Sequence, residues 1–355
     1  MTMTSEFRLI KQYFTAPTRH TSLGIGDDAA LISVGAGMQL AISTDMLIAG
    51  THFFHDAAPY DIGWKALAVN VSDMAAMGAK PKWATLAIAL PQILPSPSHG
   101  EGQDGGRTFT PTPMSTPSSA LPLEEGGGIN EAWLSKFSRG FFACADAFNI
   151  DLIGGDTTRG SLNISVTIMG EVPTGKALRR DGAKIDDDIW VSGQLGSAAL
   201  GLAHLQGKTH VPEVALVACL NALHNPMPRA ALGLALRGIA TSCVDISDGL
   251  MADLGHILTA SNCGAAIDLE KIPCLEYLKN DLNNAETQQR LLAGGDDYEL
   301  CFTAPKSKCE EISLLSKQLN LAITCIASTR TAIGLQAYYK NKQITLLKQG
   351  FDHFG

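Results

Sequence analysis

The chain has 355 residues, of which 45% are hydrophobic and 17% are charged. This length is sufficient for two domains, and the composition is that of a globular protein rather than a disordered one. The formal net charge is −8, and the sequence contains no dense block of Lys and Arg. Because nucleic acids and anionic membrane surfaces require clustered cations, neither is expected as a partner.

The cysteines and the N-terminus indicate where the protein works. The eight cysteines form no C-x-x-C pair and no Cys/His group at zinc spacing, which is typical of free thiols in a reducing compartment. The N-terminus has no charged segment followed by an apolar one, so no signal peptide is expected. No apolar run has the length needed to cross a bilayer. We therefore expect a cytoplasmic protein.

The hydrophobic pattern of the first half predicts both helices and strands. The predicted elements are a helix at 5–16, strands at 29–34 and 40–43, a helix at 59–77, a strand at 83–90, a helix at 131–148, and strands at 152–153 and 162–170 on either side of a Gly-rich turn. Residues 93–128 are rich in Pro, Ser, Thr and Gly and have few large apolar side chains. They cannot bury enough surface to offset the entropy of ordering, so they are interpreted as a flexible surface insertion.

The second half shows the same mixture. Its predicted elements are strands at 188–192, 243–246, 265–269 and 298–303, and helices at 196–205, 212–223, 229–237 and 250–260. Strands and helices in both halves indicate α/β or α+β domains, with a junction near residue 170. We expect an N-terminal domain at 1–170 and a C-terminal domain at 171–355.

Aspartates beside Gly, Ser or Thr, just after apolar runs, carry the chemical signal. The five motifs are Gly26-Asp27-Asp28, Ser43-Thr44-Asp45, Ser72-Asp73, Gly154-Gly155-Asp156-Thr157 and Asp245-Ile246-Ser247-Asp248-Gly249. Ligands collect at strand ends in α/β sheets, and Mg²⁺ prefers carboxylate and hydroxyl oxygens. Glycines allow backbone N–H groups to approach a phosphate closely.

Any one of these motifs is also typical of a turn or a helix cap. Ser72-Asp73 in particular has the composition of a cap at the start of a helix. The five motifs together favour one aspartate-rich site for Mg²⁺ and phosphate. The sequence has no G-x-x-x-x-G-K-[ST] loop, no H-R-D or D-F-G set, no G-x-S-x-G elbow and no H-E-x-x-H pair, which excludes the enzyme classes that these motifs mark.

These motifs, in this order, resemble the thiamine-monophosphate kinase family. The resemblance extends to Gly-Thr-His-Phe at 50–53, the segment 64–81, Arg-Asp-Gly-Ala at 180–183 and Gly-Gly-Asp-Asp-Tyr-Glu-Leu at 294–300, and covers nearly the whole chain apart from 93–128. It implies a two-domain, mixed α/β (α+β) fold like that of aminoimidazole ribonucleotide synthetase. It also implies a homodimer formed through strands of the N-terminal domain, which would bind ATP and Mg²⁺.

The resemblance implies that ATP phosphorylates thiamine monophosphate to thiamine diphosphate, the last step of thiamine diphosphate biosynthesis. The γ-phosphoryl group would pass directly and in line, assisted by several Mg²⁺ ions. The implied metal ligands are Asp28, Ser43, Thr44, Asp45, Asp73, Asp156, Asp245 and Asp248. The implied ATP contacts are Gly155, Asp156, Arg180 and Ser247, and the implied thiamine contacts are His52, Asp296 and Phe351. The family usually carries Glu where this chain has Asp296.

The residues themselves fit a phosphate acceptor. A phosphate oxygen is already ionised near neutral pH and needs no general base, so the difficulty is to bring two polyanions together. Several alternatives stay open. The residues alone favour a capping or packing role for His52. A related ATP-using synthetase, a cation-binding protein without catalysis and a metal-dependent phosphatase would share parts of the pattern, although selenophosphate synthesis is disfavoured because no cysteine precedes Cys144.

Overall fold

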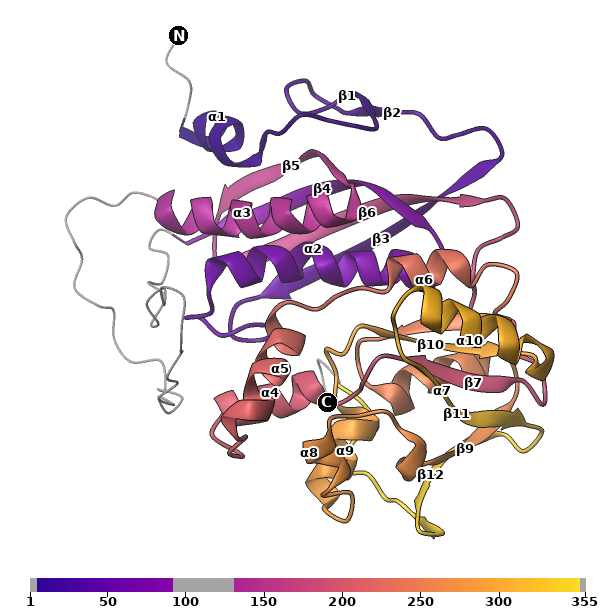
Figure 1. The fold of residues 1–355 in the computed structure, drawn as a ribbon. Helices are drawn as coiled ribbons and strands as arrows, with labels where there is room; N and C mark the ends of the chain where they lie inside the picture. The colour runs from indigo at the N-terminus through magenta and orange to yellow at the C-terminus, as the bar shows by residue number, and fades with distance from the viewer. Residues whose placement is uncertain (1–4, 92–130, 352–355) are drawn as a thin grey trace.

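The computed structural model describes residues 5–91 and 131–351, and the predicted insertion at 93–128 lies outside them. The described chain forms two layered halves, one above the other in Figure 1. The predicted mixture of helices and strands in both halves is confirmed. Among the described helices, none is long and apolar enough to span a membrane.

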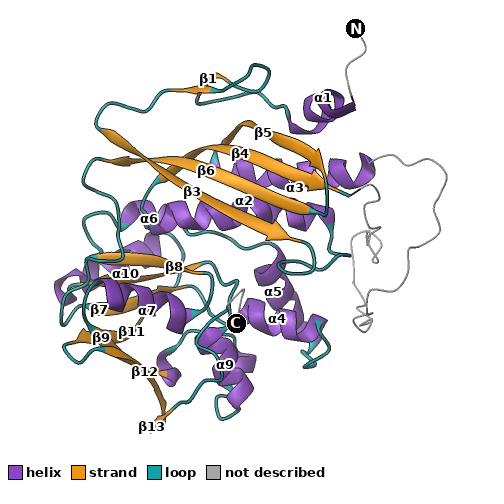
Figure 2. Ribbon diagram, turned by 180° about the vertical axis from the view of Figure 1, so that it is seen from behind, coloured by secondary structure: helices purple, strands orange, loops and turns teal. Residues whose placement is uncertain are grey.

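The N-terminal half is a four-stranded sheet with two long helices on one face (Figure 2). Its elements are α1 (Ser5–Leu9), a π-helix (Ile10–Phe14), the hairpin strands β1 (Thr21–Leu23) and β2 (Leu31–Ile32), β3 (Met38–Ile48), α2 (Pro59–Ala76), β4 (Lys80–Leu90), α3 (Glu131–Phe148), β5 (Asp151–Arg159) and β6 (Asn163–Pro173). The strand order is β3-β6-β4-β5, so β3 and β5 form the two edges. Only β4 and β5 are parallel, joined by a crossover that contains α3.

Two glycines allow α2 and α3 to pack closely. A Cβ on Gly63 of α2 would lie 2.1 Å from the Phe137 carbonyl oxygen, and a Cβ on Gly140 of α3 would lie 1.9 Å from the Tyr60 carbonyl oxygen. No side chain fits at these distances, so glycine at both positions sets the spacing of the helices. This spacing in turn fixes where α2 lies over the sheet.

The C-terminal half is built on a seven-stranded sheet of order β13-β12-β9-β11-β7-β10-β8. Its strands are β7 (Asp188–Ser192), β8 (Ser242–Ile246), β9 (Gly264–Asp268), β10 (Glu299–Ala304), β11 (Ile323–Arg330), β12 (Gly334–Tyr339) and β13 (Lys342–Gln343). Its α-helices are α4 (Ser197–Leu205), α5 (Glu213–His224), α6 (Ala230–Ala235), α7 (Leu250–Ala260), α8 (Glu276–Lys279), α9 (Ala285–Ala293) and α10 (Cys309–Gln318).

A continuous hydrophobic core joins the halves. One buried cluster contains residues of α2 and α3 together with Trp190, Cys243 and Phe302 of the second sheet. The helical face of the first sheet is therefore also the face that meets the C-terminal half. The proposed domain boundary at 170 falls within β6 and stays a prediction.

Two expectations about the aspartates were wrong. The Gly-rich segment after Ile153 is not a turn, because β5 continues through it to Arg159 and pairs with β4 along its length. Asp45 and Asp156 consequently lie inside strands rather than past their ends. Asp73 lies in the last turns of α2, so Ser72-Asp73 is not a cap at the start of a helix. Small and polar residues obscured the full lengths of β3 and β5, which the sheet stabilises.

Candidate active site

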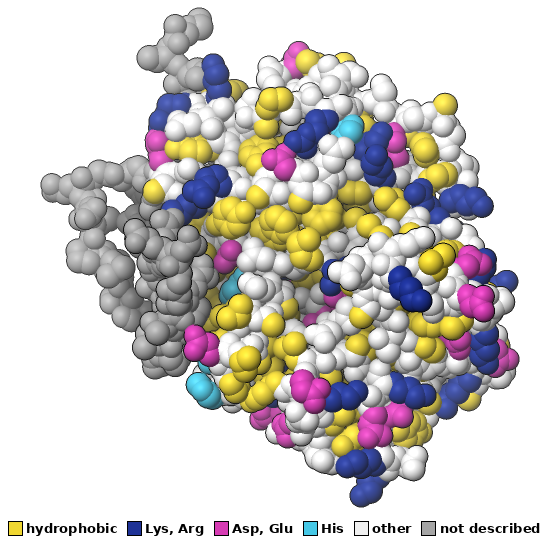
Figure 3. Space-filling model, in the orientation of Figure 1, with side chains coloured by type: hydrophobic (Ala, Val, Ile, Leu, Met, Phe, Trp, Pro, Cys, Tyr) yellow, Lys and Arg dark blue, Asp and Glu magenta, His cyan; other side chains and the backbone are white. Residues whose placement is uncertain are grey.

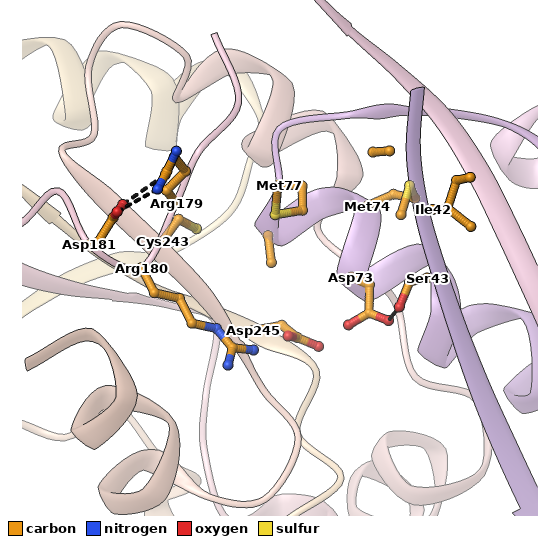
Figure 4. Close-up of a pocket in the computed structure, with 12 residues that line it drawn as sticks. Ile42, Ser43, Asp73, Met74, Met77, Arg179, Arg180, Asp181, Cys243 and Asp245 are labelled. Carbon is orange, nitrogen blue, oxygen red and sulfur yellow. Dashed lines mark hydrogen bonds and ion pairs between the residues drawn. The ribbon is translucent and has the colours of Figure 1, made fainter. Parts of the chain in front are cut away.

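A pocket of about 510 Å³ lies between the two halves (Figure 4). Its walls come from β3, the C-terminal end of α2, the segment 179–181 and β8. It brings together four residues that the sequence predicted for metal or ATP: Ser43, Asp73, Arg180 and Asp245. These residues are separated by up to 202 positions in the chain (245 − 43), so the fold alone makes them neighbours.

Helix α2 organises the acidic wall of this pocket. Ser43 on β3 donates a hydrogen bond of 2.5 Å to an Asp73 carboxylate oxygen, and Ser72 donates one of 2.7 Å to Asp245 on β8. The Asp45 backbone N–H donates to the Asn70 side chain, 3.2 Å away. Neighbouring positions in α2 thus bind β3 of the first sheet, through Ser43 and the Asp45 backbone, and the Asp245 carboxylate of the second sheet.

The carboxylates are crowded and poorly solvated. Burial, followed by the charges of Asp73, Asp245 and Asp248, raises the pKa of Asp45 to about 7. Burial and then the charge of Asp73 raise the pKa of Asp245 to about 7 as well. Burial raises the pKa of Asp73, although its bond from Ser43 and the charge of Arg180 oppose this. A bound cation would relieve this repulsion.

Arginine provides positive charge at the same pocket. Arg179 is held by Asp181 through two hydrogen bonds of 2.8 and 2.5 Å. The guanidinium of Arg180 instead points toward Asp245, on the acidic side of the pocket (Figure 4). Arg180 is therefore placed to contact an anionic ligand that lies against the aspartates.

A second group of predicted residues surrounds the start of α7. Asp253, in the first turn of α7, accepts hydrogen bonds of 3.1 Å from the backbone N–H groups of Ser247, Asp248 and Gly249. The Ser247 carbonyl accepts from the Asp296 N–H at 2.8 Å, and the Asp248 carbonyl accepts from the Phe351 N–H at 3.0 Å. The fold therefore collects four predicted residues, Ser247, Asp248, Asp296 and Phe351, around one loop.

Asp253 is a site residue that the sequence interpretation missed. Burial, followed by the charge of Asp248, raises the pKa of its carboxyl group to about 7, despite the three N–H donors. Its spacing of four residues after Gly249, at a helix start, was the signal that could have identified it.

The acids at 296–299 have three different roles. Asp296 contacts Lys65 of α2 at 3.0 Å and accepts a hydrogen bond of 2.9 Å from Tyr298. Asp297 accepts from the Gly196 N–H at 3.0 Å, just before α4, and satisfies a donor at the start of that helix. Glu299 accepts from Arg229 and, at 2.5 Å, from Ser192. Only Asp296 therefore faces the N-terminal half.

Other predicted residues do not reach the pocket between the halves. Asp28, Gly155 and Asp156 line a separate pocket of about 680 Å³ beside β5. A Cβ on Gly155 would lie 1.8 Å from the Leu86 carbonyl oxygen, so only glycine fits there. The Thr44 hydroxyl contacts Thr167 at 2.8 Å on the opposite face of the sheet from α2. His52 Nδ1 accepts from the Ile48 N–H at 3.0 Å, which supports its capping role.

The residues of the pocket fit a Mg²⁺ ion that the protein and the substrate would coordinate together. Within 5–91 and 131–351, no three His, Cys, Asp or Glu side chains converge closely enough to hold an ion by themselves. Mg²⁺ commonly takes only one or two protein carboxylates, together with water and substrate phosphates. Asp73, Asp245 and the Ser43 hydroxyl supply that type of partial set, and a bound cation would relieve the repulsion between the two carboxylates.

Comparisons with known proteins place the chain in a family. Residues 26–103 and 114–172 match the AIR synthase related protein N-terminal domain, and residues 184–318 match the AIR synthase related protein C-terminal domain. The interruption at 104–113 falls inside the segment predicted as an insertion. The predicted two-domain fold is thereby confirmed.

Individual relatives match over the full length. The thiamine-monophosphate kinase of Escherichia coli K12 is 40% identical over 354 residues, which cover 98% of each chain. A crystal structure of thiamine-monophosphate kinase from Stenotrophomonas maltophilia has a TM-score of 0.74 and 41% identity, and the match covers 91% of this chain and 92% of that one. A structure described as AaThiL complexed with AMPPCP and TMP has a TM-score of 0.70 and 28% identity, and the match covers 94% and 93%. The chain belongs to the thiamine-monophosphate kinase family of AIR synthase related proteins.

Proposed function

We propose that this chain transfers the γ-phosphoryl group of ATP to thiamine monophosphate, giving thiamine diphosphate and ADP, at the pocket between its two halves. The observation that carries the proposal is the convergence of Ser43, Asp73, Arg180 and Asp245 in that pocket. The family supports the reaction, because one relative's structure is described as holding both AMPPCP and TMP. The eight cysteines, all within the described residues, are free thiols, which supports a cytoplasmic location.

The lining of the pocket suits a phosphate acceptor. The described residues that line it include no histidine, and the acceptor oxygen is already ionised, so no general base is required. Direct, in-line transfer needs the two anions to be aligned and their charge to be neutralised. Several Mg²⁺ ions, each bound by one or two of Asp45, Asp73, Asp245 and Asp248 together with substrate phosphates, would supply that neutralisation. Arg180 would contact the ATP phosphates from the opposite wall.

The thiamine end of the acceptor would lie toward the α7 loop. Asp296 and Phe351 both contact that loop through their backbones, and the Phe351 side chain is 50% exposed. An exposed aromatic side chain and a carboxylate are suitable partners for a cationic heteroaromatic ring. The Nδ1 atom of His52 accepts from the Ile48 N–H, so His52 would contact the acceptor only through the rest of its ring.

We propose further that the enzyme works as a homodimer through the uncovered face of the first sheet. Four side chains of β3 that point away from α2 are apolar and exposed: Met38 39%, Ile42 61%, Met46 49% and Ile48 36%. Figure 2 shows that no described helix covers this face. A row of exposed apolar side chains on an edge strand is typical of an interface. The opposite side of the molecule, seen in Figure 3, shows cationic and anionic side chains interspersed, without a large block of either sign.

The dimer would also account for the separate pocket. Asp45 lies on β3 and Asp156 on β5, at opposite edges of the sheet and three strand spacings, or about 14 Å, apart. Ligands of one Mg²⁺ lie about 2 Å from the ion, so these two residues of one chain cannot share it. We therefore assign Asp28, Gly155 and Asp156 to the part of the site that a partner copy contributes.

The reaction is tested by following products from ATP with three acceptors: thiamine monophosphate, thiamine and water. The proposal expects thiamine diphosphate and ADP in equal amounts, only with the monophosphate and only with Mg²⁺. Free phosphate released from the monophosphate without ATP would instead identify a phosphatase. ATP consumption that is independent of the monophosphate would identify a different ATP-using enzyme of the same fold.

Subunit mixing tests the shared site. The Asp73→Asn and Asp156→Asn variants are each expected to be inactive alone. If one site uses Asp73 of one copy and Asp156 of the other, a heterodimer of the two variants contains one intact site and recovers activity. Heterodimers that form, as shown by differently tagged subunits, yet remain inactive would assign both residues to the same chain's site.

A further inference from the structure

Lys65 is a buried cation that the reaction proposed above does not use. It lies on α2 and is only 5% exposed. Its ammonium nitrogen lies 3.0 Å from a carboxylate oxygen of Asp296, in the other half of the molecule. A lysine is rarely buried to this degree without a specific partner, because removing its charge from water is costly. The ion pair therefore links the two halves at a defined point.

Lys65 and Asp73 belong to the same functional side of α2. They are eight residues apart, which corresponds to about 12 Å along a helix and to slightly more than two turns. Asp73 lines the pocket proposed for phosphoryl transfer, whereas Lys65 contacts the acid proposed to bind the acceptor. One rigid helix therefore sets the distance between the two parts of the site.

The turn that carries Asp296 is unusual in its backbone. Asp296 has φ +69° and Tyr298 has φ +49°, both in the left-handed region that bulky residues rarely adopt. Two backbone hydrogen bonds of 2.8 Å hold this turn, from the Asp296 N–H to Ser247 and from the Tyr298 N–H to Ile246. Such strain persists only where the surroundings fix it, and it often marks functional sites.

Both oxygens of Asp296 are engaged, yet the group remains accessible. One oxygen faces Lys65, and the other accepts the Tyr298 hydroxyl at 2.9 Å. The Asp296 side chain is nevertheless 30% exposed, so a ligand can reach part of it, and a carboxylate oxygen can accept more than one hydrogen bond. Burial, the charge of Asp296 and more distant carboxylates raise the pKa of Tyr298, so its hydroxyl remains a donor. The two donors hold the carboxylate in one orientation.

We propose that Lys65 is a positioning residue for the acceptor: it holds the Asp296 carboxylate, across the junction of the two halves, in the orientation that accepts hydrogen bonds from the amino group of a cationic heteroaromatic ligand. This inference rests on the proposed function. It adds that acceptor recognition depends on the alignment of the two halves, since neither half contains both members of the ion pair. Lys65 acts through Asp296 and does not contact ATP.

The test compares Lys65→Met, Asp296→Asn and the double variant by steady-state kinetics and thermal unfolding. Lys65→Met is expected to raise the KM for thiamine monophosphate roughly 10- to 100-fold, the range expected for a lost charged hydrogen-bond partner. The KM for ATP is expected to stay within about twofold, since Lys65 is about 12 Å from Asp73. The double variant is expected to be no worse than Asp296→Asn alone, because the two residues act as one unit.

Arg229→Met is the matched control. Arg229 Nε donates a hydrogen bond of 2.6 Å to the buried Glu299 in the same half, and neither residue lines either pocket. This variant is expected to lower the unfolding temperature without changing either KM. Lys65→Arg, which keeps the charge, is expected to recover part of the affinity for thiamine monophosphate.

Three results would overturn the inference: an unchanged KM for the monophosphate, equal rises in both KM values, or additive effects in the double variant. Each of these results would leave the proposed reaction intact, because the comparison of KM values requires a wild type that makes thiamine diphosphate. A wild type that makes none would contradict the proposed function itself. Should Lys65→Met not fold, Lys65→Gln keeps a donor of similar length and carries the same comparison.

Discussion

Asp245 illustrates at the scale of one residue how this site differs from an ordinary core. Its side chain is only 5% exposed, on a strand whose other residues are buried as well. The Ser72 hydroxyl is its hydrogen-bond donor, at 2.7 Å, while Asp73 and Asp253 add negative charge. Burying a carboxylate next to others costs free energy, which a bound cation offsets at neutral or higher pH. We interpret this residue as a site where stability is sacrificed for ligand binding.

Replacing Asp245 with Asn therefore has opposite effects on stability and activity. The folded-state pKa is about 7, above the ordinary value of 3.8, so the folded protein binds more protons than the unfolded chain between these values. The free energy of unfolding thus falls as the pH rises from about 4 to about 7. Asp245→Asn should remove that loss of stability, which is on the order of 4 kcal/mol at pH 8 without metal, and should abolish activity.

Thermal unfolding at pH 5 and pH 8, with and without Mg²⁺, checks this prediction. The variant should unfold at a higher temperature than wild type, and this difference in unfolding temperature should be larger at pH 8 than at pH 5. Mg²⁺ should reduce the difference by stabilising the wild type. A variant that is less stable than wild type at pH 8 in EDTA would show that the carboxylate is a net structural contact.

At the scale of an element, α2 determines the geometry of the site. It carries Lys65 and Asp73 and rests on α3 through Gly63 and Gly140. The close approach at Gly63 leaves no space for a methyl group, because the Phe137 carbonyl oxygen lies 2.1 Å from the Cβ position. Any displacement of α2 moves the residues of both parts of the site at once.

Gly63→Ala is expected to destabilise the protein by about 1–3 kcal/mol, since it forces α2 and α3 apart. It should also lower kcat, because Asp73 moves with the helix. Gly255→Ala in α7 is the control, since no atom lies within 4 Å of its Cβ position and alanine favours a helix by about 0.5–1 kcal/mol. Chemical denaturation measures the free energy of unfolding of both variants, and steady-state kinetics measure kcat. Equal stability changes in the two variants would contradict the role assigned to the α2–α3 contact.

At the scale of the whole molecule, local pattern predicted the long helices well but only parts of the long strands β3 and β5. Helices α2, α3 and α7 were predicted within a residue at either end, because their periodicity and end residues act locally. The half-exposed strands β11 and β12 were not predicted, since their alternation is weak and the sheet stabilises them.

The site was predictable in composition but not in arrangement. The motifs identified Asp73 and Asp245 as chemical residues, and the fold brings them together. The sequence did not indicate that Lys65 meets Asp296 or that Asp253 supports the α7 loop, because such pairings depend on how distant elements pack. It also did not separate Asp28 and Asp156 from the others, since strand order within the sheet decides that distance.

The acidic pocket between the halves is the proposed place of Mg²⁺-dependent transfer from ATP to thiamine monophosphate. The most direct measurement is the single-turnover rate of thiamine diphosphate formation across a Mg²⁺ titration, for wild type and for Asp73→Asn. We predict a wild-type rate that rises with Mg²⁺ and a loss of at least about 100-fold in the variant, with its fold and melting behaviour intact. A variant that turns over at the wild-type rate with the same Mg²⁺ dependence would contradict the assignment of this pocket.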